Sequence, residues 1–390
     1  MKRIYFDHSA TTPVDERVAV VMNEYMLEKF GNPSSVHSFG REARAALEQA
    51  REEVALLLNC SPEEVYFTSG GTEADNLALI GYALQHRDRG DHIAISNIEH
   101  PAVHNSAEEL ERLGFSVTRV PVDRFGEVHA DAVAEALTER TILVSVMQVN
   151  NEFGTVNDIG AVGALLRGRH IAFHTDAVQG FGKLPIDVRE MALDMVSLSA
   201  HKIYGPKGVG ALYIRKGITV EPRVFGGHQE LGVRSGTENL PGIIGLGMAA
   251  QLCREEMLDE AARLSALRDE LYTRLTDELD DVTLNGHPTR RLPGNLNLSF
   301  HGVEGESMLM ALDLEDVAAS TGSACASGST KPSRALLALG ISPEVAQSSM
   351  RFTLGRGNTA RDVDYAARVI IGIVNRLRAT AGVELAAVRS

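Results

Sequence analysis

The chain has 390 residues, of which 44% are hydrophobic and 23% are charged, as in an ordinary globular protein. This composition excludes a disordered, fibrous or disulfide-dense chain, and the length indicates roughly two to three domains. With 52 acidic and 38 basic side chains, the net charge is −14. We expect no direct nucleic-acid partner, because an acidic chain offers little of the basic surface that binds nucleic acid.

The apolar stretches and the cysteines bear on where the protein works. The longest apolar stretch, 241–253, is too short to span a bilayer, and the N-terminal MKRIYFDHSATTP contains no apolar signal region. The three cysteines, Cys60, Cys253 and Cys325, lie far apart without a C-x-x-C pair. We therefore expect a cytoplasmic protein without a membrane partner, a disulfide framework or a zinc site.

Short β-branched runs alternate with amphipathic stretches through the first two thirds of the chain. This alternation is typical of βαβ units and predicts an α/β fold with a mainly parallel sheet covered by helices on both faces. The predicted strands are 64–68, 92–96, 141–146, 171–175 and 195–198, and the predicted helices between them are 73–86, 101–113 and 131–139.

The remaining third predicts a smaller α+β unit. A charged stretch with periodic leucines, 255–278, predicts an extended surface helix. Beyond it we predict strands at 295–300 and 350–354 and helices at 306–312 and 361–377. We expect a large α/β domain over 15–255 and a small domain made of 1–14 and 256–390, with a small-molecule site in the crevice between them.

The segment FTSGGTEADN follows a predicted strand and opens a predicted helix. Its glycines, Gly70 and Gly71, allow close approach of the backbone, and Thr72 offers a hydroxyl near the helix start. Unpaired N–H groups and the helix dipole favour an anion there, so the turn could bind a phosphate. The lysine of a P-loop is missing, which argues against a nucleoside triphosphate. A simple turn capped by Thr72 is the alternative, and this motif alone does not decide between them.

A lysine and an aspartate lie at the ends of neighbouring predicted strands. Lys202, in SLSAHKIYGPKG, is flanked by Ser199 and His201, and suits a Schiff base beside a phosphate. Asp176 ends the strand 171–175, where a carboxylate points into the crevice of an open sheet. Each has an ordinary alternative, a solvent-exposed lysine or a helix cap. Together they supply the amine and the anion that a pyridinium cofactor requires.

Three further polar residues follow predicted strands. His100 could stack on a flat cofactor, or simply be a capping or buried histidine. Asn151, after a strand predicted to reach residue 149, and Gln179 could each hydrogen-bond a ring hydroxyl.

The C-terminal region adds a thiol and a guanidinium. Cys325 lies in ASTGSACASGSTKPS, whose small residues give the loop little to pack with, so its thiol suits an accessible nucleophile. We expect Cys60 and Cys253 to be ordinary buried thiols. Arg351, in a predicted strand, could bind a substrate carboxylate with both prongs of its guanidinium.

Taken in order, the motifs GNPSSVH, FTSGGTEADN, VNNEFG, HTDAVQ, SAHKIYGPKGVGALY, VRSGTEN and GSACASG resemble those of the cysteine desulfurases. These are pyridoxal-phosphate enzymes of the class V aminotransferase group, and the resemblance runs from YFDHSATTP to MRFTLGR. It implies the PLP-dependent transferase fold of type I, and conversion of L-cysteine to L-alanine with a persulfide on the enzyme. The extended GSAC loop is similar to that of the NifS/IscS type (group I), which supplies sulfur for iron–sulfur cluster assembly or other thio-cofactors.

The same resemblance implies a role for each site residue. Lys202 would form the Schiff base and carry a proton, Asp176 would hold the pyridine nitrogen, and Arg351 would bind the substrate carboxylate. Cys325 would take the sulfur, and it could transiently ligate an iron–sulfur cluster with a scaffold partner, while no resident metal is expected. The other implied roles are ring stacking and catalysis for His100, contacts to ring substituents for Gln179 and Asn151, substrate contact for Asn151, and phosphate binding for Gly71, Thr72, Ser199, Ala200 and His201.

The resemblance also implies partners. Thr237, in VRSGTEN, matches a residue that reaches the phosphate of the neighbouring subunit, which implies a homodimer. The expected partners are L-cysteine and an iron–sulfur scaffold or another sulfur-acceptor protein. Two alternatives stay open: a selenocysteine lyase or related class V lyase, and a silent protein that only relays sulfur between partners.

Overall fold

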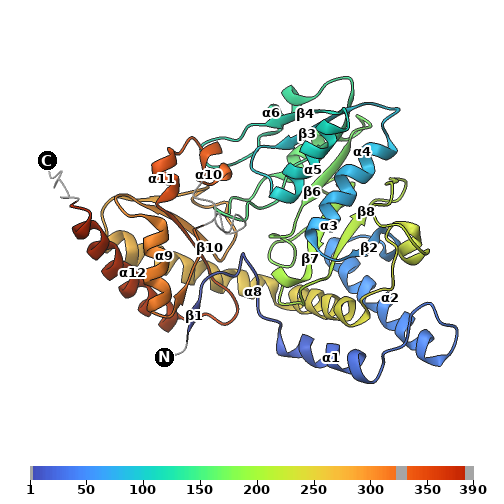
Figure 1. Cartoon of the computed structure of the whole chain (residues 1–390), viewed down its shortest axis with the longest axis horizontal. Coiled ribbons are helices and arrows are strands. Elements are labelled where there is room, and N and C mark those ends of the chain that lie inside the picture. Colours follow the sequence, from blue (N-terminus) through green and yellow to red (C-terminus); the bar gives the residue numbers. More distant parts are fainter. Residues whose placement is uncertain (1–2, 322–331, 383–390) are drawn as a thin grey trace.

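A seven-stranded sheet forms the centre of the larger lobe (Figure 1). The computed structural model describes residues 3–321 and 332–382. Neighbouring strands from β4 to β7 run parallel, whereas β8 runs antiparallel to β7 and to β2. The predicted α/β fold with a mainly parallel sheet is confirmed. In spatial order the strands are β2 (Val65–Thr68), β8 (Gly210–Ile214), β7 (Met195–Ser199), β6 (Ala172–Asp176), β5 (Thr141–Ser145), β3 (His92–Ser96) and β4 (Ser116–Val120).

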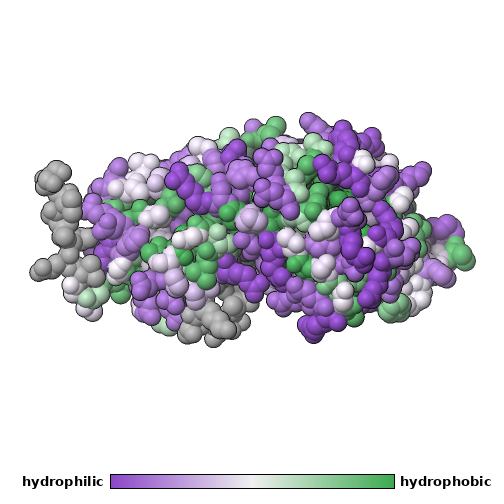
Figure 2. Space-filling model, turned by 90° about the horizontal axis from the view of Figure 1, so that it is seen from above, coloured by the Kyte–Doolittle hydropathy of each residue, from purple (hydrophilic) through white to green (hydrophobic). Residues whose placement is uncertain are grey.

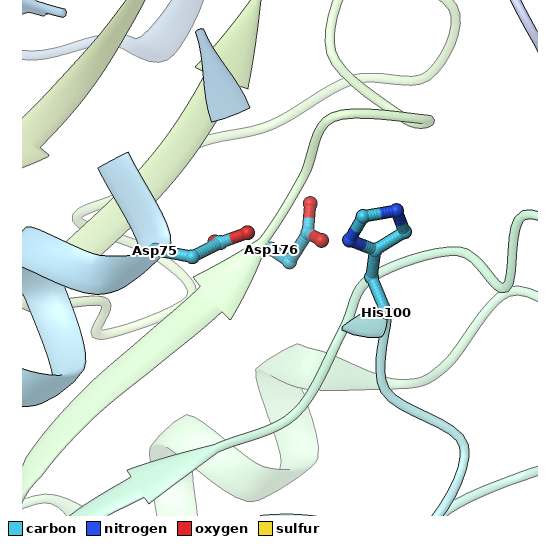
Figure 3. A group of neighbouring side chains, drawn as sticks. All are labelled: Asp75, His100 and Asp176. Carbon is cyan, nitrogen blue, oxygen red and sulfur yellow. The ribbon is translucent and has the colours of Figure 1, made fainter. Parts of the chain in front are cut away.

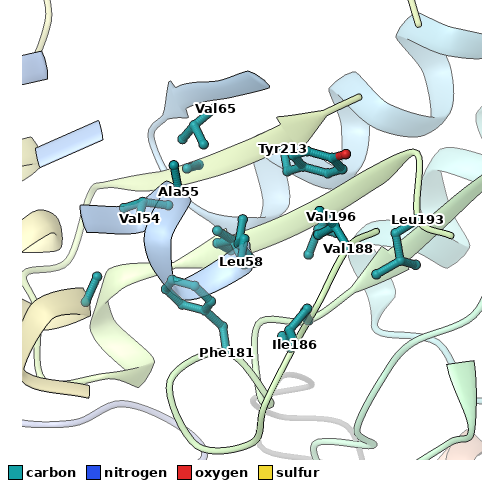
Figure 4. Packing of buried hydrophobic residues seen from close by; sticks show 14 of the residues in the cluster. Val54, Ala55, Leu58, Val65, Phe181, Ile186, Val188, Leu193, Val196 and Tyr213 are labelled. Carbon is teal, nitrogen blue, oxygen red and sulfur yellow. The ribbon is translucent and has the colours of Figure 1, made fainter. Parts of the chain in front are cut away.

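Alternate residues of the central strands contribute to two cores. Every residue of β3 and β5 to β8 is buried, because helices cover both faces of the sheet. Ile93 and Ile95 join one apolar cluster, and Ala94 between them joins the other. Figure 4 shows part of the second cluster, where side chains of α2 gather near those of β7 and β8. The first cluster includes α3 (Gly71–Asn76), α4 (Tyr82–Gln85) and α5 (Pro101–Arg112); the second includes α2 (Ser38–Leu58), α6 (Ala130–Ala136), α7 (Ile159–Leu166) and part of α8 (Leu240–Glu278).

Two predicted helices differ from the observed ones. The helix predicted over 73–86 begins earlier and is interrupted by a π-helical turn, Leu77–Gly81, between α3 and α4. The helix predicted over 255–278 is the second half of α8, which has 39 residues. Its first half shows no apolar stripe because it is buried on nearly every side; a Cβ at Gly247 would lie 2.6 Å from Ala50 of α2.

The smaller lobe is built around antiparallel strands. An apolar cluster joins these strands to the second half of α8 and to the N-terminal strand β1. The predicted division into 15–255 and 1–14 with 256–390 stays a prediction, and α8 crosses its boundary (Figure 1). The strands are β12 (Ser349–Thr353), β10 (Asn295–Phe300) and β9 (Val282–Leu284), with β1 (Ile4–Tyr5) paired to β11 (Val317–Ala318); the helices are α9 (Gly305–Leu314), α10 (Arg334–Ala338), α11 (Pro343–Gln347) and α12 (Ala360–Thr380).

The face of the molecule seen in Figure 2 is mostly polar. Figure 2 shows hydrophilic side chains over most of the visible face, with hydrophobic ones in scattered groups. One such group lies at the end of the molecule where Figure 1 places the connection between α1 (Glu16–Leu27) and α2. Within the described ranges, no helix is both long enough and apolar enough to cross a membrane.

A buried ion pair connects α2 to the turn before α8. The guanidinium of Arg51 donates to both carboxylate oxygens of Glu230 at 2.8 Å, and the Phe67 N–H donates to the same carboxylate. Arg51 and Glu230 are each 7% exposed. The pair therefore holds α2 against β2.

We expect Glu230→Gln to lower the free energy of unfolding by about 3 kcal/mol, because it leaves the Arg51 charge buried without its main partner. Chemical denaturation at a fixed protein concentration measures this. Glu48→Gln is the matched control, since Glu48 also pairs with Arg51 but is partly exposed, and its loss should cost less than about 1 kcal/mol. An equal loss of unfolding free energy in the two variants would contradict the larger contribution that we assign to the buried Glu230.

Candidate active site

Most of the residues predicted for the site line one cavity of about 350 Å³ at the carboxyl ends of the sheet strands. Parallel strands bring their ends to the same edge, which is why residues distant in sequence meet there. The predicted residues that line it are Gly71, Thr72, His100, Asn151, Asp176, Gln179, Ser199, His201, Lys202 and Arg351, and the cavity is completed by Ser9, Ala10, Asp75, Met147 and Val178.

The glycine turn closes one side of this cavity. Gly70 has a φ of +152°, a conformation that other residues rarely adopt. A Cβ at Gly71 would lie 2.6 Å from the Val178 side chain, so glycine is required there too. Thr72 follows in the first turn of α3, and Ser199, at the end of β7, is buried opposite. This turn combines the start of α3 with the hydroxyls of Thr72 and Ser199, a combination suited to a phosphate.

Lys202 is held by the N-terminal segment. It ends a short 3₁₀ turn after β7, and its Nζ donates to the carbonyls of Ser9 at 2.5 Å and Ala10 at 2.8 Å. Neither of these partners was predicted, since a backbone acceptor leaves no mark in the sequence. Beside it, His201 is hydrogen-bonded to the Thr11 hydroxyl through Nδ1, and burial lowers the pKa of His201 to about 4. His201 is therefore neutral at physiological pH.

Asp176 lies at the centre of a buried polar group shown in Figure 3. It is 5% exposed and accepts a hydrogen bond of 2.9 Å from the Val178 N–H. Polar atoms of Asp176, His100 and Asp75 all lie within 4.8 Å of one another. Burial raises the pKa of Asp176 above its ordinary value, and the nearby His100, the Val178 N–H and Lys202 offset part of this rise. These neighbours favour an ionised Asp176. Asp75, which sequence reasoning missed, comes from α3.

His100 both caps a helix and faces the cavity. The Ala102 N–H donates to its Nδ1 at 3.1 Å, so the ring begins α5 as a cap. The two interpretations of His100 are thus compatible. Burial lowers the pKa of His100, and the charge of Asp176 raises it.

Gln179 and Asn151 reach the cavity from two different turns. Nε2 of Gln179 donates to the Ser9 carbonyl at 2.9 Å, whereas its buried Oε1 accepts no hydrogen bond from any described residue. Asn151 lies further from its strand than predicted: β5 ends at Ser145, and a turn closed by the pair of Val149 and Val156 follows. The unpaired, buried Oε1 of Gln179 inside this polar cavity indicates that a ligand group binds there.

Arg351 enters the cavity from the smaller lobe. It is 2% exposed on β12, donating to Asp7 Oδ1 at 2.8 Å and to the Asn151 carbonyl at 2.9 Å. Its buried Nε donates no hydrogen bond within the described part of the chain. The backbones of Arg351 and Ser320 are paired, so Ser320 lies beside Arg351. Asp7 was not predicted.

Two of the predicted residues that the structure describes, Ala200 and Thr237, do not line the cavity. Ala200 is fully buried and donates its N–H to the Val209 carbonyl. Thr237 is exposed just before α8. Cys325 lies outside the described residues.

The residues present fit pyridoxal phosphate. The cavity combines a glycine turn, an amine at Lys202, a buried carboxylate at Asp176 and an imidazole at His100. The unpaired Oε1 of Gln179 and Nε of Arg351 add an acceptor and a cationic donor for ligand groups. This donor set matches an anionic, aromatic, aldehyde-bearing cofactor together with an amino-acid carboxylate.

Comparisons with known proteins agree with this geometry. A family model described as aminotransferase class-V matches residues 4–366. A protein of Dictyoglomus turgidum named cysteine desulfurase IscS is 48% identical over 379 residues, covering 97% of this chain and 96% of that protein. A solved NifS-like protein is 37% identical with a TM-score of 0.90, covering 96% of this chain and 100% of its own. A solved structure of SspA in complex with cysteine is 36% identical with a TM-score of 0.81, covering 90% and 98%. The chain therefore belongs to the pyridoxal-phosphate-dependent cysteine desulfurases of the class-V aminotransferase family.

Proposed function

We propose that this chain takes the sulfur atom from L-cysteine, holds it as a persulfide on Cys325 and releases L-alanine. The observation that carries the proposal is one cavity that combines Lys202, Asp176 and Arg351, which reach it from both lobes. The cysteine bound by SspA, a structural relative of this chain, supports the same substrate. Overall, L-cysteine and the Cys325 thiol give L-alanine and the persulfide, which balances without an outside oxidant.

Each part of the cofactor has a set of residues in this chain. Bound pyridoxal phosphate withdraws electrons from the α-carbon of the amino acid and so weakens the bonds to it. We assign its phosphate to Gly71, Thr72, Ser199 and His201, its ring nitrogen to Asp176, its ring face to His100, and its ring substituents to Gln179 and Asn151.

Lys202 is assigned the proton transfers. The carbonyls of Ser9 and Ala10 hold its Nζ at the cavity wall, where the half-buried amine faces the space assigned to the substrate. A neutral amine accepts the α-proton and returns a proton to the β-carbon as alanine forms. The two carbonyls favour the charged amine, so they provide a resting position for Lys202 between these transfers.

Arg351 is assigned the substrate carboxylate. We expect Arg351→Lys to raise the KM for L-cysteine by about 10- to 150-fold, the equivalent of the 1.5–3 kcal/mol of a hydrogen bond to a charged group. Lysine keeps the charge but loses the forked geometry. Cofactor content, read from visible absorbance, should not change. Arg361→Lys, at an exposed position of α12, is the control. An unchanged KM would contradict this assignment. The role of Arg351 would then be to hold Asp7 through their hydrogen bond.

We also propose a homodimer. Apolar side chains are exposed along α1 and its connection to α2, and in the segment that leads to Thr237. A second copy that covers this surface would bring the exposed Thr237 toward a neighbouring cavity. Sedimentation velocity at micromolar concentration tests this, and a monomer would contradict it. The exposed apolar side chains are Val20, Met26, Leu27, Phe30, Val36, Phe39, Val224, Phe225 and Leu231.

The sulfur acceptor is proposed to be a cytoplasmic iron–sulfur scaffold or another acceptor protein. The direct test of the function is to load the purified chain with pyridoxal phosphate and measure alanine and sulfide from L-cysteine. L-selenocysteine is run in parallel, because exclusive turnover of it would favour the selenocysteine lyase. Cofactor loading without turnover of either amino acid would overturn the proposed activity.

A further inference from the structure

A second buried carboxyl, that of Asp75, lies beside Asp176 in the cavity wall (Figure 3). It is 1% exposed, comes from α3 immediately after the phosphate turn, and lies within 4.8 Å of Asp176. Its Oδ1 accepts no hydrogen bond from residues 3–321 or 332–382. Two carboxylates that are buried this close together cannot both remain ionised at low cost. We therefore expect the pair of carboxyls to hold one proton.

A neutral histidine, His174 of β6, lies next to Asp75. His174 lies two residues before Asp176 on β6, so both side chains leave the same face of the strand. The His174 ring is hydrogen-bonded on both nitrogens to serine hydroxyls, Ser145 on β5 and Ser197 on β7, at 2.9 Å each. Its Nε2 lies 3.6 Å from Asp75 Oδ1. Burial lowers the pKa of His174 to about 3, so the imidazole brings no positive charge to Asp75.

The groups around the two carboxyls place the proton on Asp75. Asp176 has the Val178 N–H, His100 and Lys202 to stabilise its charge. Asp75 is faced by Asp176, by Glu99 and by the Ser197 hydroxyl. Burial first, and then the Asp176 charge, raises the pKa of Asp75 well above its ordinary range, and the Ser197 hydroxyl offsets only part of this. Burial likewise raises the pKa of Glu99 to about 8.

We propose that Asp75 is a positioning residue that carries the proton of a buried carboxyl pair, so that Asp176 alone presents a negative charge to the ring nitrogen of the cofactor. This inference rests on the proposed function for the assignment of Asp176, and it adds the role of Asp75. A single charge matches a single pyridinium proton, whereas two charges would attract a second cation or proton into the site. The neutral His174 and the Ser197 hydroxyl lie next to this acid and add no charge to it.

Infrared spectroscopy tests the protonation state directly, because a carboxylic acid and a carboxylate absorb at separate C=O frequencies. At pH 7, in the cofactor-loaded enzyme, Asp75→Asn should remove an acid band and Asp176→Asn a carboxylate band. Glu99→Gln is the matched control, which should remove its own acid band and leave that of Asp75. Loss of a carboxylate band in Asp75→Asn would overturn the proposal. Where that variant fails to fold, wild type with ¹³C-labelled aspartate carboxyls gives the same decision by NMR.

Cofactor affinity gives a second readout. Since asparagine mimics a neutral acid, the Asp75→Asn dissociation constant for pyridoxal phosphate should stay within about threefold of wild type, whereas Asp176→Asn should weaken it by about 10- to 100-fold. Equal weakening in both variants would make Asp75 an anion in its own right and overturn the proposal. Failure of the proposed function would show differently: the cofactor-loaded wild type would form no alanine from L-cysteine, while its infrared bands would still report on Asp75.

Discussion

Lys202→Ala should lack the visible absorbance of the cofactor-bound enzyme and lose turnover of L-cysteine by at least about 10³- to 10⁴-fold. Proton transfer by a positioned group contributes up to that factor by itself, and this variant also loses the amine that bonds to the cofactor. Among the described residues, Lys202 is the lysine that lines the cavity, and alanine leaves its backbone turn unchanged. Absorbance after addition of pyridoxal phosphate and alanine formed from L-cysteine are the two measurements.

The matched control for this result is Lys207→Ala. Lys207 lies five residues further along the same glycine-rich turn region but is exposed, so its loss should leave both absorbance and turnover near those of wild type. Turnover by Lys202→Ala within tenfold of wild type would refute the assignment. In that case Lys183, whose pKa is lowered by burial and in part by the charge of Lys202, would be the next residue to test.

The sequence was most informative where polar residues end parallel strands. Asp176 ends β6, and Ser199 ends β7 just before Lys202, so the geometry of a parallel sheet alone predicts that they meet. The glycine turn was readable for the same reason, since it follows a strand and opens a helix. The structure brings all of these residues to one cavity.

The partners of these residues could not be predicted. Lys202 is held by two backbone carbonyls of the N-terminal segment, and Arg351 is held by Asp7. These contacts depend on how the N-terminal segment passes between the lobes, which no local pattern encodes. Asp75 was overlooked because an acidic residue in a helical stretch is usually solvated, and only the tertiary structure buries it.

The sequence analysis did not predict α2, β4 and β8, and the reason differs for each of them. α2 carried a readable signal, with buried Ala43, Leu47, Ala50 and Val54 spaced by three or four residues. β4 is an edge strand whose residues are mostly exposed or half-buried, so it has no apolar run. The reversed direction of β8 depends on the tight turn after Lys202, and strand direction is not encoded in a strand's own sequence.

The structure argues against Cys60 and Cys253 as the thiol that receives the sulfur from L-cysteine. Cys253 is buried in the core between α8 and the sheet, and burial raises its pKa to about 11. Cys60 is half-buried, and burial raises its pKa to about 12. Because the thiolate is the attacking species, neither is suited to take sulfur at neutral pH, and neither lines the cavity. Cys325 itself lies outside the described residues, and Ser320, five residues before it in the sequence, is paired with Arg351 at the cavity.

Cys325→Ser should therefore separate cofactor and substrate binding from sulfur transfer. No residue assigned to the cofactor or to the substrate carboxylate changes, so the variant should take up pyridoxal phosphate and change its absorbance when L-cysteine is added. Alanine formation and protein-bound persulfide should fall by at least about 10³-fold, as expected when a nucleophile is removed, because a serine hydroxyl does not replace a thiolate at neutral pH. Cys60→Ser, measured in parallel, should turn over as wild type does. Near-normal alanine formation by Cys325→Ser would place the sulfur acceptor elsewhere, and the assignment of this loop as the sulfur carrier would then be wrong.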